Sequence, residues 1–419
     1  METSFKRIGI AIMFVFLFAG FTDIFAQDYD KYFTISGVVK DRSNRKNLEY
    51  VNISVPGSNL SSITNEDGYF LLKIKDSINA KEIEFSRIGY FSTSIPLNGR
   101  DLLDQTFYLN QNEKQLKEIV VAGWENPMDL VKEALRRVGS NYSNKPNLFT
   151  GFYRETVQKS RKFVNISEAV INIYKSPYQH NIVSDRVQIF KGRKLISTKT
   201  SDTLAVKLLG GPNLSIYGDI VKNPDILFDE ESLYYFNFKM EESKFMDNRQ
   251  QFVVSFTPAV ILHYPLYYGI LYIDKETLAF TRAEFFLDMK DRNKATDAIL
   301  RKKPSGLRFK PDEVSFIVSY KQRDGKSYLN YIRNEVRFKC DWTRKLFSTN
   351  YTVQSEMVVT ESKEESVSII PRRDSFNERE SLSDKVMSFY DDNFWGAYNI
   401  IEPTESLEAA VNKLKKEYK

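Results

Sequence analysis

The side chains that most often act in metal-dependent hydrolysis are scarce in this chain. Its 419 residues include two histidines, His180 and His263. A zinc carboxypeptidase site needs a His and a Glu three residues apart and a distant third ligand, because catalytic zinc takes three protein ligands and one open position. Asn-Ile-Val follows His180 and Tyr-Pro-Leu follows His263, so neither has a Glu at that spacing. We therefore expect no metal site and no cofactor.

Nucleophilic chemistry has equally little support in the sequence. The one cysteine, Cys340, lies in the strand-like run Val336–Trp342. We expect a buried, unreactive thiol there, and one cysteine excludes an internal disulfide. The chain contains no Gly-x-Ser-x-Gly elbow, P-loop or dinucleotide-binding fingerprint. We therefore predict no catalytic residues and a protein that is not an enzyme.

The first 26 residues are expected to direct export. Lys6 and Arg7 precede the apolar run Ile8–Phe21, and Ala26 stands before a polar stretch that begins at Gln27. This order is typical of a secretory signal peptide with cleavage between Ala26 and Gln27. An uncleaved anchor is the alternative, but the run is shorter than the ~20 apolar residues that span a bilayer. No later stretch is long and apolar enough to span as a helix, so we expect a location in the periplasm or cell envelope, with outer-membrane association or the extracellular space as the other options.

Composition favours a mainly β, globular protein. Aromatic residues make up 14%, hydrophobic residues 42% and charged residues 27%, and an aromatic surplus suits the pleated surface of sheets. The net charge of +5 is too small and too dispersed to indicate nucleic acid binding. Residues 32–121 contain short strand-like runs separated by polar turns such as Asp67-Gly68, which predicts a small β-sandwich.

Three runs within residues 32–121 resemble the carboxypeptidase-like regulatory domain. They are Ile35–Val39, Leu48–Val55 and Thr64–Phe70, the last of which contains the turn pattern Thr-x-x-x-Gly-x-Phe. The resemblance implies a seven-stranded, transthyretin-like sandwich that carries no chemistry itself. The name records attachment to some carboxypeptidases and is not evidence of peptidase activity.

The rest of the chain predicts a larger β-rich body. Residues 122–145 are expected to form a helical linker, with Asn126 as its cap and Pro127 at its first position. Residues 146–362 have long runs with a period of two, which indicates a curved antiparallel sheet. The hairpin from Leu271 to Phe285 loosely resembles the half-barrel of periplasmic lipoprotein carriers. Residues 363–385 are interpreted as a polar linker, and residues 386–419 as an aromatic segment followed by a helix capped by Thr404.

Four further runs extend the resemblance to most of the chain. They look like uncharacterised secreted proteins of the Bacteroidetes type, which join such a sandwich to a β-rich body and offer no established activity to carry over. The runs are Leu209–Pro212, Lys302–Leu307, Ser355–Thr360 and Phe394–Pro403.

Two irregular regions leave alternatives open. Thr203–Phe236 is apolar but irregular, and it is interpreted as a plug over the open side of the curved sheet or as a lid above a hydrophobic ligand. The basic cluster Arg301–Lys303, with Arg308 and Lys310, is interpreted as a solvated face, with contact to anionic lipid headgroups as the alternative.

Two short runs look like the O-glycosylation sites of Bacteroidetes. They are Asp76-Ser77-Ile78 and Asp202-Thr203-Leu204, which would carry glycans on Ser77 and Thr203.

The leading functional hypothesis is an exported, non-catalytic envelope module that binds or scaffolds another envelope protein or a glycan. The alternative is a carrier or sensor of a hydrophobic ligand in a half-barrel like that of lipoprotein carriers. A carboxypeptidase-related enzyme has the least support.

Overall fold

The computed structural model describes residues 31–112, 124, 126–199, 204, 206–208, 211–227, 229–343, 348–377, 380–388 and 394–417. Ala26, Gln27 and Thr203 lie outside these ranges, as do residues 113–121 at the end of the expected sandwich.

Residues 32–109 form a β-sandwich of seven strands. One sheet has the order β4-β1-β7 and the other the order β3-β2-β5-β6. Strands β1 and β7 are parallel, and the other neighbours pair in antiparallel fashion. Gly68 has a φ of 77°, as the tight turn before β4 requires. The elements are β1 (Tyr32–Asp41), β2 (Asn52–Ser54), β3 (Ser61–Ile63), β4 (Tyr69–Lys75), η1 (Asp76–Ile78), β5 (Glu82–Ser86), β6 (Thr93–Pro96) and β7 (Leu102–Leu109).

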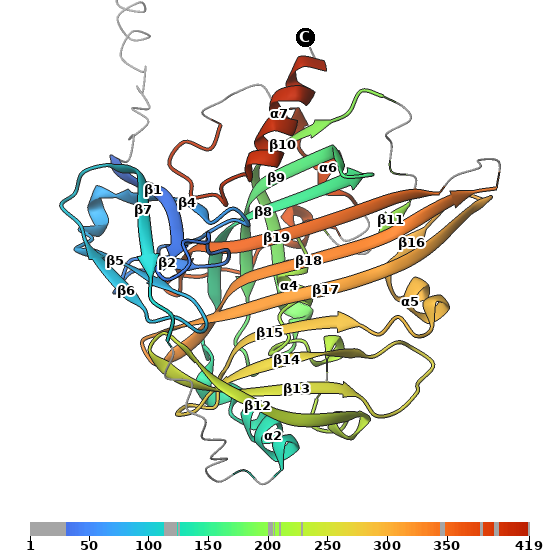
Figure 1. The fold of residues 1–419 in the computed structure, drawn as a ribbon, viewed down its shortest axis with the longest axis horizontal. Coiled ribbons are helices and arrows are strands. Elements are labelled where there is room, and N and C mark those ends of the chain that lie inside the picture. The colour runs from blue at the N-terminus through green and yellow to red at the C-terminus, as the bar shows by residue number, and fades with distance from the viewer. Residues whose placement is uncertain are drawn as a thin grey trace, which may run out of the picture.

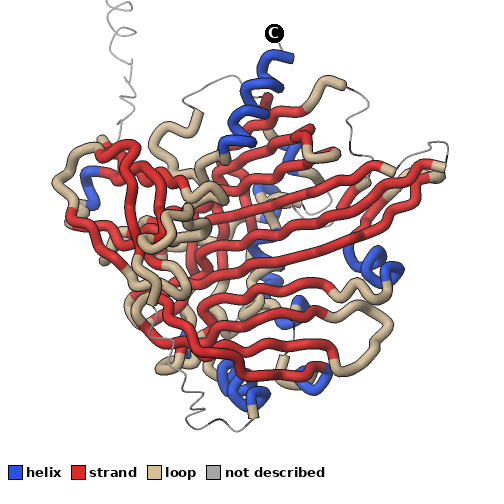
Figure 2. The backbone as a smooth tube through the Cα atoms, in the orientation of Figure 1, coloured by secondary structure: helices blue, strands red, loops and turns tan. Residues whose placement is uncertain are grey.

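A second, much larger sheet forms the body of the molecule. Its order is β12-β13-β14-β15-β17-β18-β19-β8-β9-β10-β20, and all neighbours are antiparallel except β10 and β20. Figures 1 and 2 show its long strands curving across the molecule, with the sandwich over one end. The predicted fold class, a sandwich joined to a curved antiparallel sheet with a few helices, is confirmed.

The strands of the large sheet are β8 (Asn147–Lys159), β9 (Lys162–Lys175), β10 (Arg186–Ile196), β12 (Phe236–Met246), β13 (Arg249–Pro258), β14 (Tyr267–Asp274), β15 (Phe280–Leu287), β17 (Leu307–Arg323), β18 (Lys326–Trp342), β19 (Thr349–Lys363) and β20 (Met387–Ser388). The other elements are α2 (Pro127–Arg136), α3 (Val138–Asn141), η2 (Ile182–Ser184), β11 (Lys207–Leu208), α4 (Leu214–Tyr217), η4 (Pro224–Ile226), η5 (Leu233–Tyr235), α5 (Arg292–Ile299), β16 (Leu300–Lys302), η6 (Arg372–Asp374), α6 (Leu382–Lys385) and α7 (Glu405–Glu417).

Side chains on the large sheet alternate between two apolar faces. Tyr153 and Met357 belong to the largest core cluster, which also contains buried residues of α2. Their neighbours Phe152 and Val358 belong to another cluster, together with Ile63 of the sandwich. We call these the inner face and the outer face. Both faces are covered, and this explains why the strands carry apolar residues on two sides.

The helix α2 begins as the sequence predicts. The side chain of Asn126 accepts a hydrogen bond from the backbone N–H of Met128 at 3.1 Å, and Pro127 occupies the first helical position. Leu130, Val131 and Ala134 are buried against the inner face. The helix therefore packs on its own domain.

The segments that follow β19 also pack against the body. Ile370, Phe376 and Leu382 are buried within the stretch interpreted as a polar linker, and the backbone N–H of Phe376 donates to the carbonyl of Val187 in β10 at 2.6 Å. Thr404 accepts a hydrogen bond from the N–H of Leu407 at 3.2 Å, as expected for a cap of α7.

Candidate functional site

The structure separates the residues that the sequence singled out. His180 and His263 are both exposed. Cys340 is buried, and this burial raises the pKa of its thiol to about 11. Ser77 is exposed in the short turn η1. In the part of the chain that the structure describes, no three His, Cys, Asp or Glu residues come together as a metal site would require.

The inner face of the large sheet is filled by the segment between β11 and β12. We call residues 211–235 the plug; all but residue 228 are described. The plug is mostly irregular, with only the short turns α4, η4 and η5. Its apolar side chains join the core cluster of the inner face. The buried apolar residues of the plug are Leu214, Ile216, Ile220, Val221, Leu227 and Leu233.

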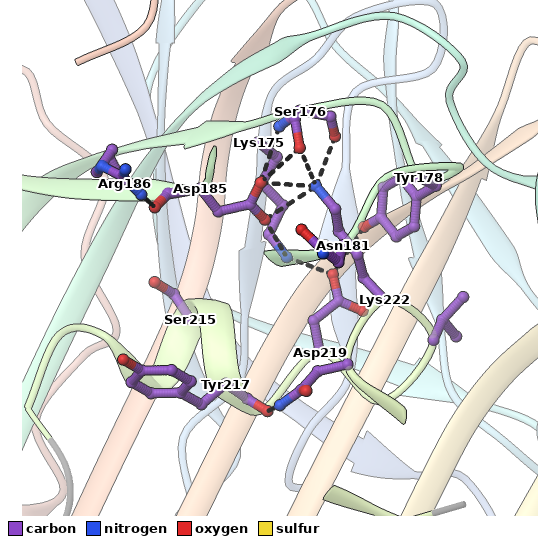
Figure 3. A network of polar contacts seen from close by, with 12 residues as sticks. Lys175, Ser176, Tyr178, Asn181, Asp185, Arg186, Ser215, Tyr217, Asp219 and Lys222 are labelled. Atoms are coloured by element: carbon purple, nitrogen blue, oxygen red, sulfur yellow. Dashed lines mark hydrogen bonds and ion pairs between the residues drawn. The ribbon is translucent and has the colours of Figure 1, made fainter. Parts of the chain in front are cut away.

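Four fully buried charged side chains fasten the plug to the sheet (Figure 3). Lys175 ends β9 and Asp185 directly precedes β10, whereas Asp219 and Lys222 belong to the plug. The ammonium of Lys175 contacts the carboxylate of Asp219 and lies 3.9 Å from that of Asp185. The ammonium of Lys222 lies 2.7 and 2.9 Å from the two carboxylate oxygens of Asp185. We call these four residues the ion cluster.

Neutral donors and acceptors complete the ion cluster. The hydroxyls of Tyr178 and Tyr320 donate to the two oxygens of Asp219 at 2.9 and 2.8 Å. Burial and the negative charge of Asp219 raise the pKa of both tyrosines well above the usual value, so they remain protonated donors. Lys222 donates to the backbone carbonyl and the hydroxyl of Ser176 at 2.6 and 2.9 Å. Burial and the charge of Lys175 lower the pKa of Lys222.

The chemistry of the ion cluster suits it to hold the plug against the sheet. It holds two cations and two anions, enclosed and engaged with one another. Sequence reasoning did not identify it, although Asp219 and Lys222 stand three residues apart in an apolar stretch. That spacing was the available signal, because buried charges need partners.

A second feature lies between the sandwich and the outer face. Two hollows of about 230 and 220 Å³ meet there and share Lys321 and Asn330 among their lining residues. The end of β12 reaches the sandwich beside one hollow: the N–H of Gly89 donates to the carbonyl of Phe245 at 2.7 Å, and the next residue, Met246, lines the hollow. Asn59, which lines the other hollow, donates to the carbonyl of Ser362 at 2.6 Å. We call this space the interdomain cleft.

Lys321 is the most unusual residue of the interdomain cleft. No carboxylate of the described residues lies within 4.0 Å of its ammonium. Burial lowers its pKa, and the charges of Asp247 and Glu84 act in the opposite direction. Burial raises the pKa of Glu84, with a further contribution from Asp247. The cleft thus holds a cation without a direct ionic partner among the described residues.

Comparisons with known proteins support the identity of the sandwich only. The family profile of the CarboxypepD_reg-like domain matches residues 35–121, in agreement with the resemblance found in the sequence. No curated protein matches the chain.

Among solved structures, the chain is similar to a LolA superfamily protein from Nitrosomonas europaea, at 9% identity and a TM-score of 0.20, over 61% of this chain and 99% of that one. It is also similar to a DUF1329 family protein from Desulfovibrio piger, at 10% identity and a TM-score of 0.24, over 58% of this chain and 95% of that one. Likenesses at this level carry no inference about function. Across the described residues, no helix combines the length and apolar character needed to cross a membrane.

Proposed function

We propose that this chain is an exported, non-catalytic carrier or sensor of an apolar ligand, which binds the inner face of the large sheet when the plug moves aside. The observation that carries the proposal is the covering of an extended apolar sheet face by an irregular segment that a buried ion cluster holds in place. In the structure, plug side chains occupy the space that the ligand would take.

The composition of the ion cluster makes plug release physically reasonable. When the plug departs, the sheet keeps one cation and one anion, Lys175 and Asp185, which already lie 3.9 Å apart. The plug keeps Asp219 and Lys222, again one of each sign. Neither surface is left with an unbalanced buried charge. Leaving one buried charge without a partner would be the most costly way to break such a cluster.

Apolar packing alone would hold the plug at least as firmly. Replacing a buried ion pair by well-packed apolar residues is often neutral or stabilising. The ion cluster therefore suits a plug that has one defined closed position on the inner face and can still move away from it. A ligand with hydrocarbon chains would replace the contacts of plug residues such as Leu214 and Ile216 on the inner face.

The proposal is tested with a fluorescent fatty-acid probe titrated into the full chain. We expect the quadruple variant Lys175→Met, Asp219→Leu, Tyr178→Phe, Tyr320→Phe, which also removes the two hydroxyls that donate to Asp219, to bind the probe at least fivefold more weakly, because an apolar anchor keeps the plug closed. Ile216→Ala should bind it more tightly, because it removes plug contacts that compete with the ligand.

Ile53→Ala in the sandwich core is the matched control, since Ile53 is fully buried but far from the plug in the fold. It should lower stability and leave probe affinity unchanged. Failure of the wild-type protein to bind the probe, or equal affinity in both plug variants, would contradict the proposal.

A second candidate function is binding of a glycan or another polar partner in the interdomain cleft. The observation that favours it is Lys321, which lines the cleft and has no ion pair among the described residues. An acidic glycan would supply the missing anion. On an array of acidic and neutral glycans, the wild-type chain should bind acidic members and Lys321→Met should lose that binding. Identical array profiles for the two proteins would exclude this role.

A further inference from the structure

The loop between β13 and β14 presents apolar side chains to solvent. Ile261 is 92% exposed and Tyr264 is 45% exposed. The loop lies beside the end of the plug, because the N–H of Ala259 donates to the carbonyl of Tyr235 at 2.7 Å. The adjacent Tyr234 is 63% exposed. We call Tyr234, Ile261 and Tyr264 the apolar tip.

Basic residues of α5 and its flanking turns lie beside the apolar tip together with Asp288 and Asp291, and Asp229 and Glu231 lie on the side of Tyr234. The ammonium of Lys294 in α5 donates to the carbonyl of Leu262 at 2.6 Å and ties this helix to the loop. Lys290 and Arg292 are close by and have side chains that are 85% and 60% exposed. The chain then continues into Arg301–Lys303, all exposed.

This part of the chain has an excess of positive charge. Residues 288–313 contain eight Lys and Arg against five Asp and Glu, in a chain whose whole net charge is +5. Four of these acids already face cations: Asp288 lies 3.8 Å from Lys290, Asp291 lies 3.8 Å from Lys294, Asp312 lies 3.9 Å from Arg292 and Glu313 lies 3.7 Å from Arg337. Figure 1 places α5 and β16 at the end of the large sheet opposite the sandwich, where β13 also ends.

We propose that this end of the molecule docks on the surface of an anionic lipid bilayer. Ile261 enters the hydrocarbon boundary, the two tyrosines lie at headgroup depth, and the neighbouring lysines and arginines contact lipid phosphates. Each residue type matches the layer it would meet: aliphatic chains favour the hydrocarbon, tyrosine favours the interface, and basic side chains extend to anionic headgroups.

The size of the tip favours a membrane over a protein partner. A stable protein interface buries roughly 1,000 Å² or more with good complementarity. Three exposed apolar side chains around one projecting loop are too few for such an interface, but they suffice for weak and reversible contact with a bilayer when basic residues assist.

Membrane docking goes beyond the proposed function, since it holds whether or not the inner face takes a ligand. It would also place the end of the plug at η5 next to the lipid surface.

The test is co-sedimentation of the full chain with vesicles of phosphatidylcholine alone and of phosphatidylcholine with 30% phosphatidylglycerol. The wild-type protein should bind the anionic vesicles at low salt, and 0.5 M NaCl should weaken that binding. Ile261→Asp should reduce binding at least tenfold, and because Ile261 is 92% exposed, the fold should be unaffected.

Val183→Asp is the matched control, because Val183 is 66% exposed and lies in η2, away from the apolar tip. It should bind vesicles like the wild type. Equal binding by Ile261→Asp, equal binding to both vesicle types, or no binding to either would overturn the proposal. Vesicle binding without uptake of the fatty-acid probe would uphold docking and contradict the carrier function, so the two proposals fail separately.

Discussion

Asp41 illustrates how a single buried carboxylate organises the sandwich. It is 1% exposed and ends β1. It accepts hydrogen bonds from the N–H and hydroxyl of Ser43 at 2.7 and 2.6 Å, and from the hydroxyl of Tyr90 at 2.9 Å. Gln111 donates to the same carboxylate. Burial by itself would raise the pKa of Asp41, but these hydrogen bonds outweigh it and hold the pKa well below 3.8.

This lowered pKa predicts an acid-sensitive sandwich. The carboxyl titrates near 3.8 when the chain is unfolded and lower when it is folded. Its contribution to stability is therefore complete above about pH 5 and declines progressively as the pH falls further. Thermal unfolding between pH 7 and pH 2.5 should show a smaller acid-induced loss in Asp41→Asn, which starts from a lower stability at pH 7.

Asp76→Asn is the control for this experiment, because Asp76 is exposed in the same domain. It should follow the wild-type pH profile. A profile of Asp41→Asn that runs parallel to the wild type at every pH would contradict the assigned role.

At the scale of elements, the sequence predicts best where a local rule acts. The helix cap at Asn126 and the turn at Asp67-Gly68 appear at the predicted residues, because capping and tight turns depend on near neighbours. The strand-like run Leu48–Val55 shortens to Asn52–Ser54 in the structure. Tyr50 adopts a φ of 56°, which interrupts an extended chain, and nothing in its local sequence requires that conformation.

The plug shows the limit of such reasoning. Its irregular, apolar sequence predicts a segment that covers the sheet, and the structure shows such a covering over the inner face. Its anchor could not be paired from sequence, because Lys175 and Asp219 are 44 residues apart. In the same way, Phe376 is buried in a stretch with few apolar residues, because a few well-placed side chains suffice to attach a polar segment.

At the scale of the whole molecule, one C-terminal segment joins the two β units. We call residues 394–405 the strap. Asn399 exchanges two hydrogen bonds with the backbone of Lys73 in the sandwich, at 2.7 and 3.0 Å. On the other side, the buried Arg154 of the large sheet donates to the carbonyl of Ile401 at 2.7 Å. Contacts between residues more than 240 positions apart leave no local signal in the sequence.

The strap predicts that the sandwich and the large sheet unfold together. Asn399→Ala leaves the N–H and the carbonyl of Lys73 without these partners in a partly buried place, which costs about 1–3 kcal/mol for an unsatisfied group. Both hydrogen bonds join the strap to the sandwich. We therefore expect Asn399→Ala to weaken the coupling between the sandwich and the large sheet more than it lowers the stability of either core. Calorimetry should show one transition in the wild type and a broadened or split transition in Asn399→Ala, with the sandwich melting first.

Asn110→Ala, at an exposed asparagine of the sandwich, is the control and should keep the single transition. A sharp transition in Asn399→Ala at the wild-type temperature would show that the strap does not couple the two units, since the covalent connection and the remaining interface contacts would then suffice.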